Sequence, residues 1–341
     1  MSDKKNNLMP MMSIIGIVLV VLGHSGYAGT NIAEDCPYLF QWIYNFHMPL
    51  FFFISGFLFS LTNESFIEMD KKKLVKKKVQ RLLVPYLVLG VVLWGIKYVF
   101  SSFASVNRQF SITSFFEMFI APSTEGSTMG YLWYLITLFM VFVLMAIFSV
   151  SHVDMKKSKW CLIVIVISWL LWQRGGNIDW FNMGAVLWYM PFFVIGIQYK
   201  KYEVVVQRII NRGGYFNISL SIVLSVLFII LPSSDFFAYK VIAALVGIWM
   251  TLSVCSCLIK KEWVVSHILS YGRYTYSIYL LSWFGQYATK FIAVNILHLQ
   301  IIVCVVLLFS MGLIVPIAID KVIDRLDNGR RYKWLRLIIG Y

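Results

Sequence analysis

Long runs of hydrophobic residues, separated by short polar and mostly basic stretches, extend along almost the whole chain. A lipid-spanning helix needs about 20 apolar residues, and a segment in lipid must satisfy its own backbone hydrogen bonds, which favours helices. The pattern therefore predicts an all-α protein, a polytopic transmembrane helix bundle with about ten spans. These segments lie at residues 11–28, 38–61, 82–103, 131–150, 160–173, 184–199, 216–232, 238–258, 274–294 and 300–319.

The composition supports a membrane protein with little soluble mass. Of the 341 residues, 60% are hydrophobic and 13% are charged, against roughly 45–50% and about 25% in soluble domains. A soluble enzyme, a disordered chain and a fibrous protein are thereby excluded. We predict one integral membrane domain over residues 1–341.

The placement of the basic residues predicts the orientation in the membrane. If the N-terminus is cytoplasmic, 25 of the 30 Lys and Arg residues fall on the inner side. The other five lie in outer loops or adjacent span ends: Lys97, Arg108, Arg174, Lys240 and Lys290. This positive-inside distribution predicts that both termini are cytoplasmic. It accounts for the net charge of +14 through contact with the lipid bilayer, so no nucleic-acid partner is expected.

The five cysteines have neither the spacing of a disulfide framework nor that of a metal site. Most lie within apolar segments, where a free cysteine acts as a small hydrophobic residue. We expect no metal and no permanently bound cofactor.

Two histidines inside apolar segments are candidates for chemistry. With a rise of 1.5 Å per residue, His24 would lie about 6 Å below the outer end of its helix and His47 about 14 Å below the outer end of the next. A neutral imidazole can deprotonate an alcohol near pH 7. The alternative for both is a histidine that only bonds to a neighbouring helix.

A basic stripe precedes the third apolar segment. On a helix that begins early, Lys73, Lys77 and Arg81 recur at i, i+4 and i+8 and share one face. Such a stripe at the inner side of the membrane suits an anionic phosphate ligand. The alternative is an anchor attracted to acidic lipids.

Several sequence blocks resemble the acyltransferase 3 family of bacterial membrane proteins, nearest to its fucose-4-O-acetylase-like members. The blocks are Val20-Val21-Leu22-Gly23-His24, the segment 46–57 with the sequence FHMPLFFFISGF, Lys77-Lys78-Val79-Gln80-Arg81 and Leu132-Trp133-Tyr134-Leu135. The likeness runs nearly end to end, with three departures. Residues 8–12, with the sequence LMPMM, lack an aspartate that members often carry there. Ser13 stands eleven positions before His24, where many members carry Arg or Lys, and Ser282 stands where a late block often ends in His.

The resemblance implies an O-acyltransferase of the bacterial cytoplasmic membrane. It would move an acetyl or similar acyl group from cytoplasmic acyl-CoA, with acetyl-CoA as donor, to a hydroxyl of an extracytoplasmic or lipid-linked glycan. His24 would be the general base, and His47 would orient it or share its role. The CoA phosphates would contact Lys77 and Arg81, with Lys73 beside them. Candidates to stabilise the oxyanion are Ser25, Asn45 and Tyr134.

Two other functions remain open from the sequence. The same scaffold without catalysis would suit an exporter of polysaccharide or lipid-linked sugar. The other alternative is a channel or structural scaffold. The small number of intramembrane charges and the paired histidines count against it.

Overall fold

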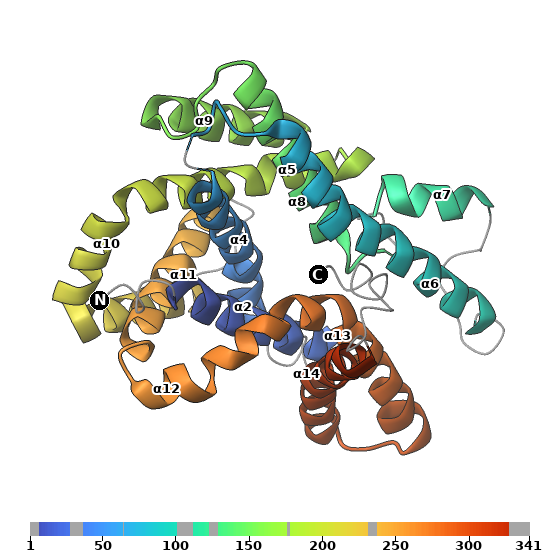
Figure 1. Ribbon diagram of the computed structural model, residues 1–341. Helices are drawn as coiled ribbons and strands as arrows, with labels where there is room; N and C mark the ends of the chain where they lie inside the picture. The colour runs from blue at the N-terminus through green and yellow to red at the C-terminus, as the bar shows by residue number, and fades with distance from the viewer. Residues whose placement is uncertain are drawn as a thin grey trace. The chain divides into compact units, whose positions relative to one another are not determined.

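The computed structural model describes residues 7–27, 37–63, 65–100, 112–122, 129–175, 178–230 and 237–326, and within these ranges all regular structure is helical (Figure 1). The α-helices are α2 (Leu8–Tyr27), α4 (Pro37–Thr62), α5 (Lys71–Lys78), α6 (Val84–Phe100), α7 (Ile112–Ile120), α8 (Trp133–Val150), α9 (Ser158–Gly175), α10 (Met183–Ile230), α11 (Phe237–Leu258), α12 (Glu262–His267), α13 (Thr275–Lys290) and α14 (Ile301–Leu326). Shorter π or 3₁₀ turns are η1 (Val79–Leu83), η2 (Trp180–Asn182), η3 (Leu269–Tyr274) and η4 (Phe291–Ile296).

Each of the ten predicted segments coincides with a helix over its described residues, which confirms the all-α prediction. The predicted segment ends at 28, 101–103 and 231–232 lie outside those residues. By length and composition, seven helical runs among the described residues can cross a membrane. The two counts differ because α10 carries two predicted segments, and α9 and α13 are not among the seven. The number of spans and the side of the termini stay predictions.

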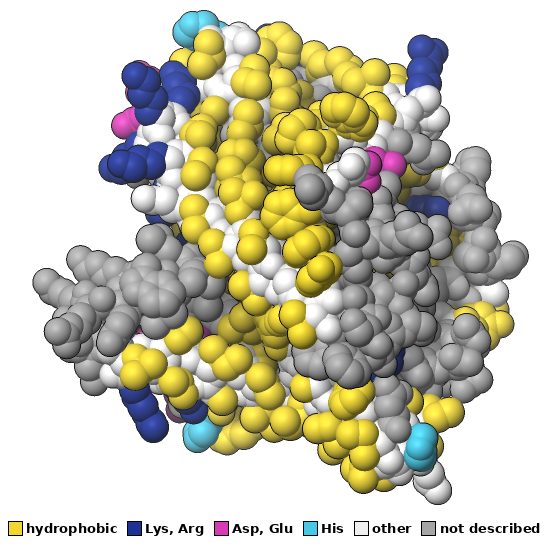
Figure 2. All heavy atoms as spheres, turned by 90° about the vertical axis from the view of Figure 1, so that its right-hand side faces the viewer, with side chains coloured by type: hydrophobic (Ala, Val, Ile, Leu, Met, Phe, Trp, Pro, Cys, Tyr) yellow, Lys and Arg dark blue, Asp and Glu magenta, His cyan; other side chains and the backbone are white. Residues whose placement is uncertain are grey.

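Large apolar side chains on the helix surfaces fit a lipid environment. On α14, for example, Ile302 is 74% exposed and Ile314 is 57% exposed. Figure 2 shows hydrophobic side chains in rows along the face that it displays. A water-soluble protein rarely exposes such a continuous apolar surface, so these helices are suited to contact with acyl chains.

By internal contacts the chain forms two compact units. One comprises residues up to Ser55 together with those from Tyr202 to Asn328, and the other runs from Gly56 to Lys201. The boundaries therefore fall inside α4 and α10. In the first unit α2 packs against α13, α14 and α11, and in the second α5 packs against α8. The prediction of one membrane domain over residues 1–341 stays a prediction.

Helix α10 contains 48 residues. A straight helix of that number of residues would be about 72 Å long, more than twice the hydrocarbon thickness. Its backbone is non-helical at Gly214, where φ is 46°, a conformation that glycine adopts at little cost. The Asn217 side chain donates hydrogen bonds of 3.2 Å to the carbonyls of Ile209 and Ile210. The break separates the two spans expected at 184–199 and 216–232, and most of the basic segment between them is helical.

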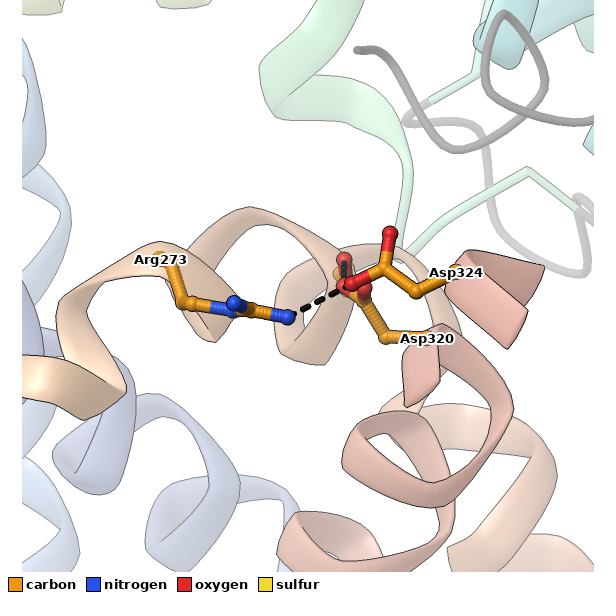
Figure 3. A network of polar contacts seen from close by, with 4 residues as sticks. Arg273, Asp320 and Asp324 are labelled. Carbon is orange, nitrogen blue, oxygen red and sulfur yellow. Dashed lines mark hydrogen bonds and ion pairs between the residues drawn. The ribbon is translucent and has the colours of Figure 1, made fainter. Parts of the chain in front are cut away.

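Polar contacts join η3 and α13 to α14 in the first unit, near the end where α14 terminates. Figure 3 shows the Arg273 guanidinium directed toward Asp324, at 2.6 Å, with Asp320 one turn away on α14. The buried Asp320 carboxylate accepts a hydrogen bond from the Ser277 hydroxyl. Because Arg273 and Asp324 are both half-exposed, their ion pair contributes little to stability. The buried bond is the more important tie between the helices, since an unpaired buried carboxylate is costly.

Gly56 provides a stability prediction in the second unit. A β-carbon there would lie 1.8 Å from the backbone oxygen of Phe193 in α10. Gly56→Ala is therefore expected to destabilise the protein by several kcal/mol, because backbone must move. Gly95 in α6 has nothing within 4 Å of such an atom, so Gly95→Ala should be neutral or stabilising by up to about 1 kcal/mol. Thermal unfolding in detergent measures both, and equal midpoints would contradict the close contact.

Candidate active site

Helix α2, which carries His24, packs against α4 through glycines. The Tyr44 ring lies over Gly23, where a β-carbon would be 3.4 Å away, and the Phe40 ring lies over Gly26, where it would be only 2.1 Å away. Because the residue numbers run in opposite directions along this contact, the two helices are antiparallel neighbours. The glycines permit this approach, and the contact holds the turn with His24 against α4.

His47 is buried on α4 and is held by its own helix. Its Nδ1 lies 2.7 Å from the carbonyl oxygen of Ile43, and its ring meets Tyr44 edge to face with 5.0 Å between the centroids. A carbonyl only accepts hydrogen bonds, so Nδ1 carries the proton and Nε2 of the neutral ring is the acceptor. His24 lies within range of an electrostatic interaction with this ring. The first unit thus places the two histidines on neighbouring helices and within electrostatic range of each other.

His24 projects from α2 on a side not occupied by these glycines, and its side chain is exposed. A base must be reachable by its substrate, and of the two histidines His24 has the more accessible side chain, since His47 is 4% exposed. Ser13 lies three turns below His24 on the same side, since eleven residues make about three turns. Its hydroxyl donates to the carbonyl of Met9 within α2.

On another face of α2 a buried polar group connects the helix to α13. The Ser25 hydroxyl donates a 2.7 Å hydrogen bond to the carbonyl of Val21, one turn back. The amide nitrogen Nε2 of Gln286 donates to that same carbonyl and to the Ser25 oxygen, each at 3.0 Å. The Ser25 hydroxyl proton is therefore already bonded to the Val21 carbonyl, and an oxyanion could accept it only by replacing that carbonyl.

The basic stripe lies in the second unit. Asp70 caps α5 by accepting a 2.9 Å hydrogen bond from the backbone N–H of Lys73, and the helix continues through the π turn η1 into α6. Lys73, Lys77 and Arg81 are all exposed. A π turn inside a longer helix is often found at a functional site, and Arg81 is one of its residues.

Lys78 is a half-buried basic residue of this segment and packs against α8. Its Nζ lies 3.6 Å from the centre of the Phe142 ring of α8, and it is close enough to Arg81 and Lys77 for their charges to repel it. A cation over a ring face is stabilised, but three neighbouring cations favour a polyanionic ligand. The sequence did not distinguish Lys78, because α5 contains six lysines and the contact with α8 is needed to select one.

The described residues contain no group of three or more His, Cys, Asp and Glu side chains placed to bind a metal ion. The described cysteines are Cys161, Cys255, Cys257 and Cys304, and each is a free thiol.

A comparison with known proteins identifies the family. A family model described as an acyltransferase domain matches residues 12–320, a range that begins in α2 and ends in α14. The chain belongs to the acyltransferase 3 family. It is also 31% identical over 152 residues to nodulation protein NolL of Mesorhizobium japonicum. That match covers 43% of this chain and 36% of NolL, so the chain spans about a third of that relative. No solved structure matches the chain significantly.

Membership of the acyltransferase 3 family confirms the resemblance of the sequence blocks and, with the apolar helices, supports a multi-pass membrane acyltransferase. The remaining candidates of this family member lie as follows. Asn45 is half-buried on α4, and Ser282 is buried on α13 one turn before Gln286. Tyr134 is buried on α8, with its ring 6.4 Å from that of Trp133 and edge-on to it.

The candidates divide between the two units. His24, Ser25, Asn45 and His47 belong to the first, whereas Lys73, Lys77, Arg81 and Tyr134 belong to the second. The roles assigned to them, and their convergence on one donor and one acceptor, stay predictions. The sequence analysis did not select Gln286. An amide inside an apolar segment is itself an indication of a functional or structural role, since polar groups in lipid are costly.

Proposed function

We propose that this acyltransferase 3 family member transfers an acyl group, with acetyl as the expected case, from cytoplasmic acyl-CoA to a hydroxyl of an extracytoplasmic or lipid-linked glycan. We place it in the bacterial cytoplasmic membrane. The observation that carries the proposal is the exposed His24 on a turn of α2 that packs against α4 and α13, with His47 on the neighbouring helix α4.

In the proposed reaction His24 accepts the proton of the sugar hydroxyl as the new C–O bond forms at the thioester carbonyl. The C–S bond then breaks, and the proton passes to the departing CoA thiolate, so the imidazole returns to its neutral state. General-base catalysis of this kind contributes roughly 10²- to 10⁴-fold to a rate. His47 would hold or assist His24 through its Nε2. Asn45 of the same unit is the proposed oxyanion donor, and Ser25 would serve only after releasing Val21. The oxyanion role of Tyr134, which belongs to the second unit, stays a prediction.

For the donor we propose that Lys78 and Arg81 contact the CoA phosphates, with Lys77 and Lys73 adding to the positive field. Charge-assisted bonds from Lys and Arg to phosphate are among the stronger hydrogen bonds in proteins. The support is the cluster of like charges around Lys78 and the exposure of its neighbours. A solvated lipid anchor would not require Lys78 to pack against Phe142.

A deletion strain tests the function. The mass spectrum of the surface and lipid-linked glycans should lose O-acyl esters, while the amount of glycan stays unchanged. In a second experiment, purified protein in liposomes should transfer label from acetyl-CoA to the glycan extracted from the deletion strain. The acetyl-CoA is supplied on the side of the basic segment. An exporter would give the opposite result, with less glycan at the surface and the same ester content per sugar. That result would reject the transferase proposal.

A further inference from the structure

The amide of Gln286 is buried inside the apolar helix α13, where polar groups are expensive unless they are hydrogen-bonded. The side chain is 3% exposed. Both of its hydrogen bonds come from Nε2 and end on α2, at the Val21 carbonyl and the Ser25 hydroxyl. These two residues lie one turn apart, and His24 stands between them in the chain.

Close packing holds this amide in place. A β-carbon on Gly312 of α14 would lie 2.7 Å from Val21 and 3.1 Å from Nε2 of Gln286. The backbone of α14 at Gly312 thus lies close to the side chains of both Val21 and Gln286, and the Gln286 side chain has little freedom to rotate away. On another face of the same turn, Tyr44 covers Gly23. The backbone that bears His24 is therefore fixed by α4 on one face and by α13 on the other.

We infer that Gln286 is a positioning residue, which sets the rotation of the last turn of α2 and thereby the direction of the His24 ring. This inference rests on the proposed role of His24 as general base. Gln286 acts through Val21 and Ser25 and takes no proton itself, since an amide does not titrate. Removing its bonds lets the turn shift, and a displacement of about 1 Å can cost a catalytic group roughly 100-fold in rate.

The test replaces Gln286 by methionine, which has a similar length and no hydrogen bonds. With purified protein in liposomes, we expect the turnover rate for acetyl-CoA and a glycan acceptor to fall roughly 10- to 100-fold. The KM for acetyl-CoA should stay at the wild-type value, because the donor contacts are unchanged. The rate at which diethyl pyrocarbonate modifies His24, followed by peptide mass spectrometry, should rise as the turn is released.

Gln198→Met is the matched control. The Gln198 amide also donates two hydrogen bonds, to the Met155 carbonyl and to Cys161 Sγ, each at 2.9 Å. This variant should keep both the turnover rate and the modification rate of His24. If Gln286→Met does not fold, Ser25→Ala removes one of the two acceptors and should shift both measurements in the same direction by less.

The inference is overturned if both Met variants lose activity in proportion to folded protein, or if Gln286→Met changes neither turnover nor the modification of His24. If the wild-type protein transfers nothing from acetyl-CoA, the proposed function fails. The modification rates then still decide whether Gln286 positions His24.

Discussion

Exchange of His24 for alanine is expected to abolish acyl transfer while the protein still inserts and folds. The exposed ring makes little contribution to packing, so its loss should cost little stability. The loss of a general base should lower the turnover rate by roughly 10² to 10⁴. Transfer from labelled acetyl-CoA in liposomes and the O-acyl content of surface glycan in a complemented deletion strain both measure the effect.

His267→Ala is a suitable control, because His267 is another exposed histidine of the first unit and has no proposed role. Full transfer by the His24 variant would remove this residue from the mechanism. If His47→Ala were inactive while His24→Ala kept full transfer, the base would instead be His47. Its Nε2 is the acceptor when Nδ1 is bonded to Ile43.

The second large effect is expected at the donor site. Lys78→Met should keep the apolar contact with Phe142 and lose the charge, which raises the KM for acetyl-CoA roughly 10- to 100-fold. That range follows from the roughly 1.5–3 kcal/mol assigned to a hydrogen bond with a charged group. Steady-state kinetics with acetyl-CoA measure it directly.

Acetyl-pantetheine sharpens this experiment, because it carries the thioester without the phosphates. With this donor, wild-type protein and the Lys78 variant should have the same KM. Lys72→Met removes an exposed lysine of the same helix and should have a small effect with either donor. Equal effects of the two substitutions on acetyl-CoA would indicate a general electrostatic contribution, and the phosphate contact at Lys78 would be rejected.

The sequence predicted the helices well, because a lipid-spanning segment has few alternatives to a helix. It missed α7, whose nine residues are too few to give a membrane signal. The charged middle of α10 was predicted as a loop between two spans, since charge density alone does not distinguish a surface helix from a loop. The break at Gly214 depends on one backbone conformation, which apolar periodicity does not encode.

At the site, His24 and His47 lie on apolar segments that only residues 29–37 separate, and elements joined by so short a connection are usually neighbours. The glycine contacts confirm that these helices pack together. The importance of Lys78 and Gln286 could not be predicted from the sequence. It depends on their contacts with Phe142 and Val21, which are distant in the chain. Contacts of that kind are determined by packing in three dimensions and leave no local pattern.

The π turn at Val79–Leu83 helps to determine which lysine of α5 packs on Phe142. A π turn usually holds one residue more than the α-helical turn that would replace it. A relative that lacks one residue here would form an uninterrupted α-helix, and everything before the deletion would rotate by about 100° relative to α6. Its lysine at the position of Lys78 would then point away from α8, and another side chain would cover the phenylalanine ring. The length of this turn, as well as the lysines themselves, therefore determines which cation packs against α8.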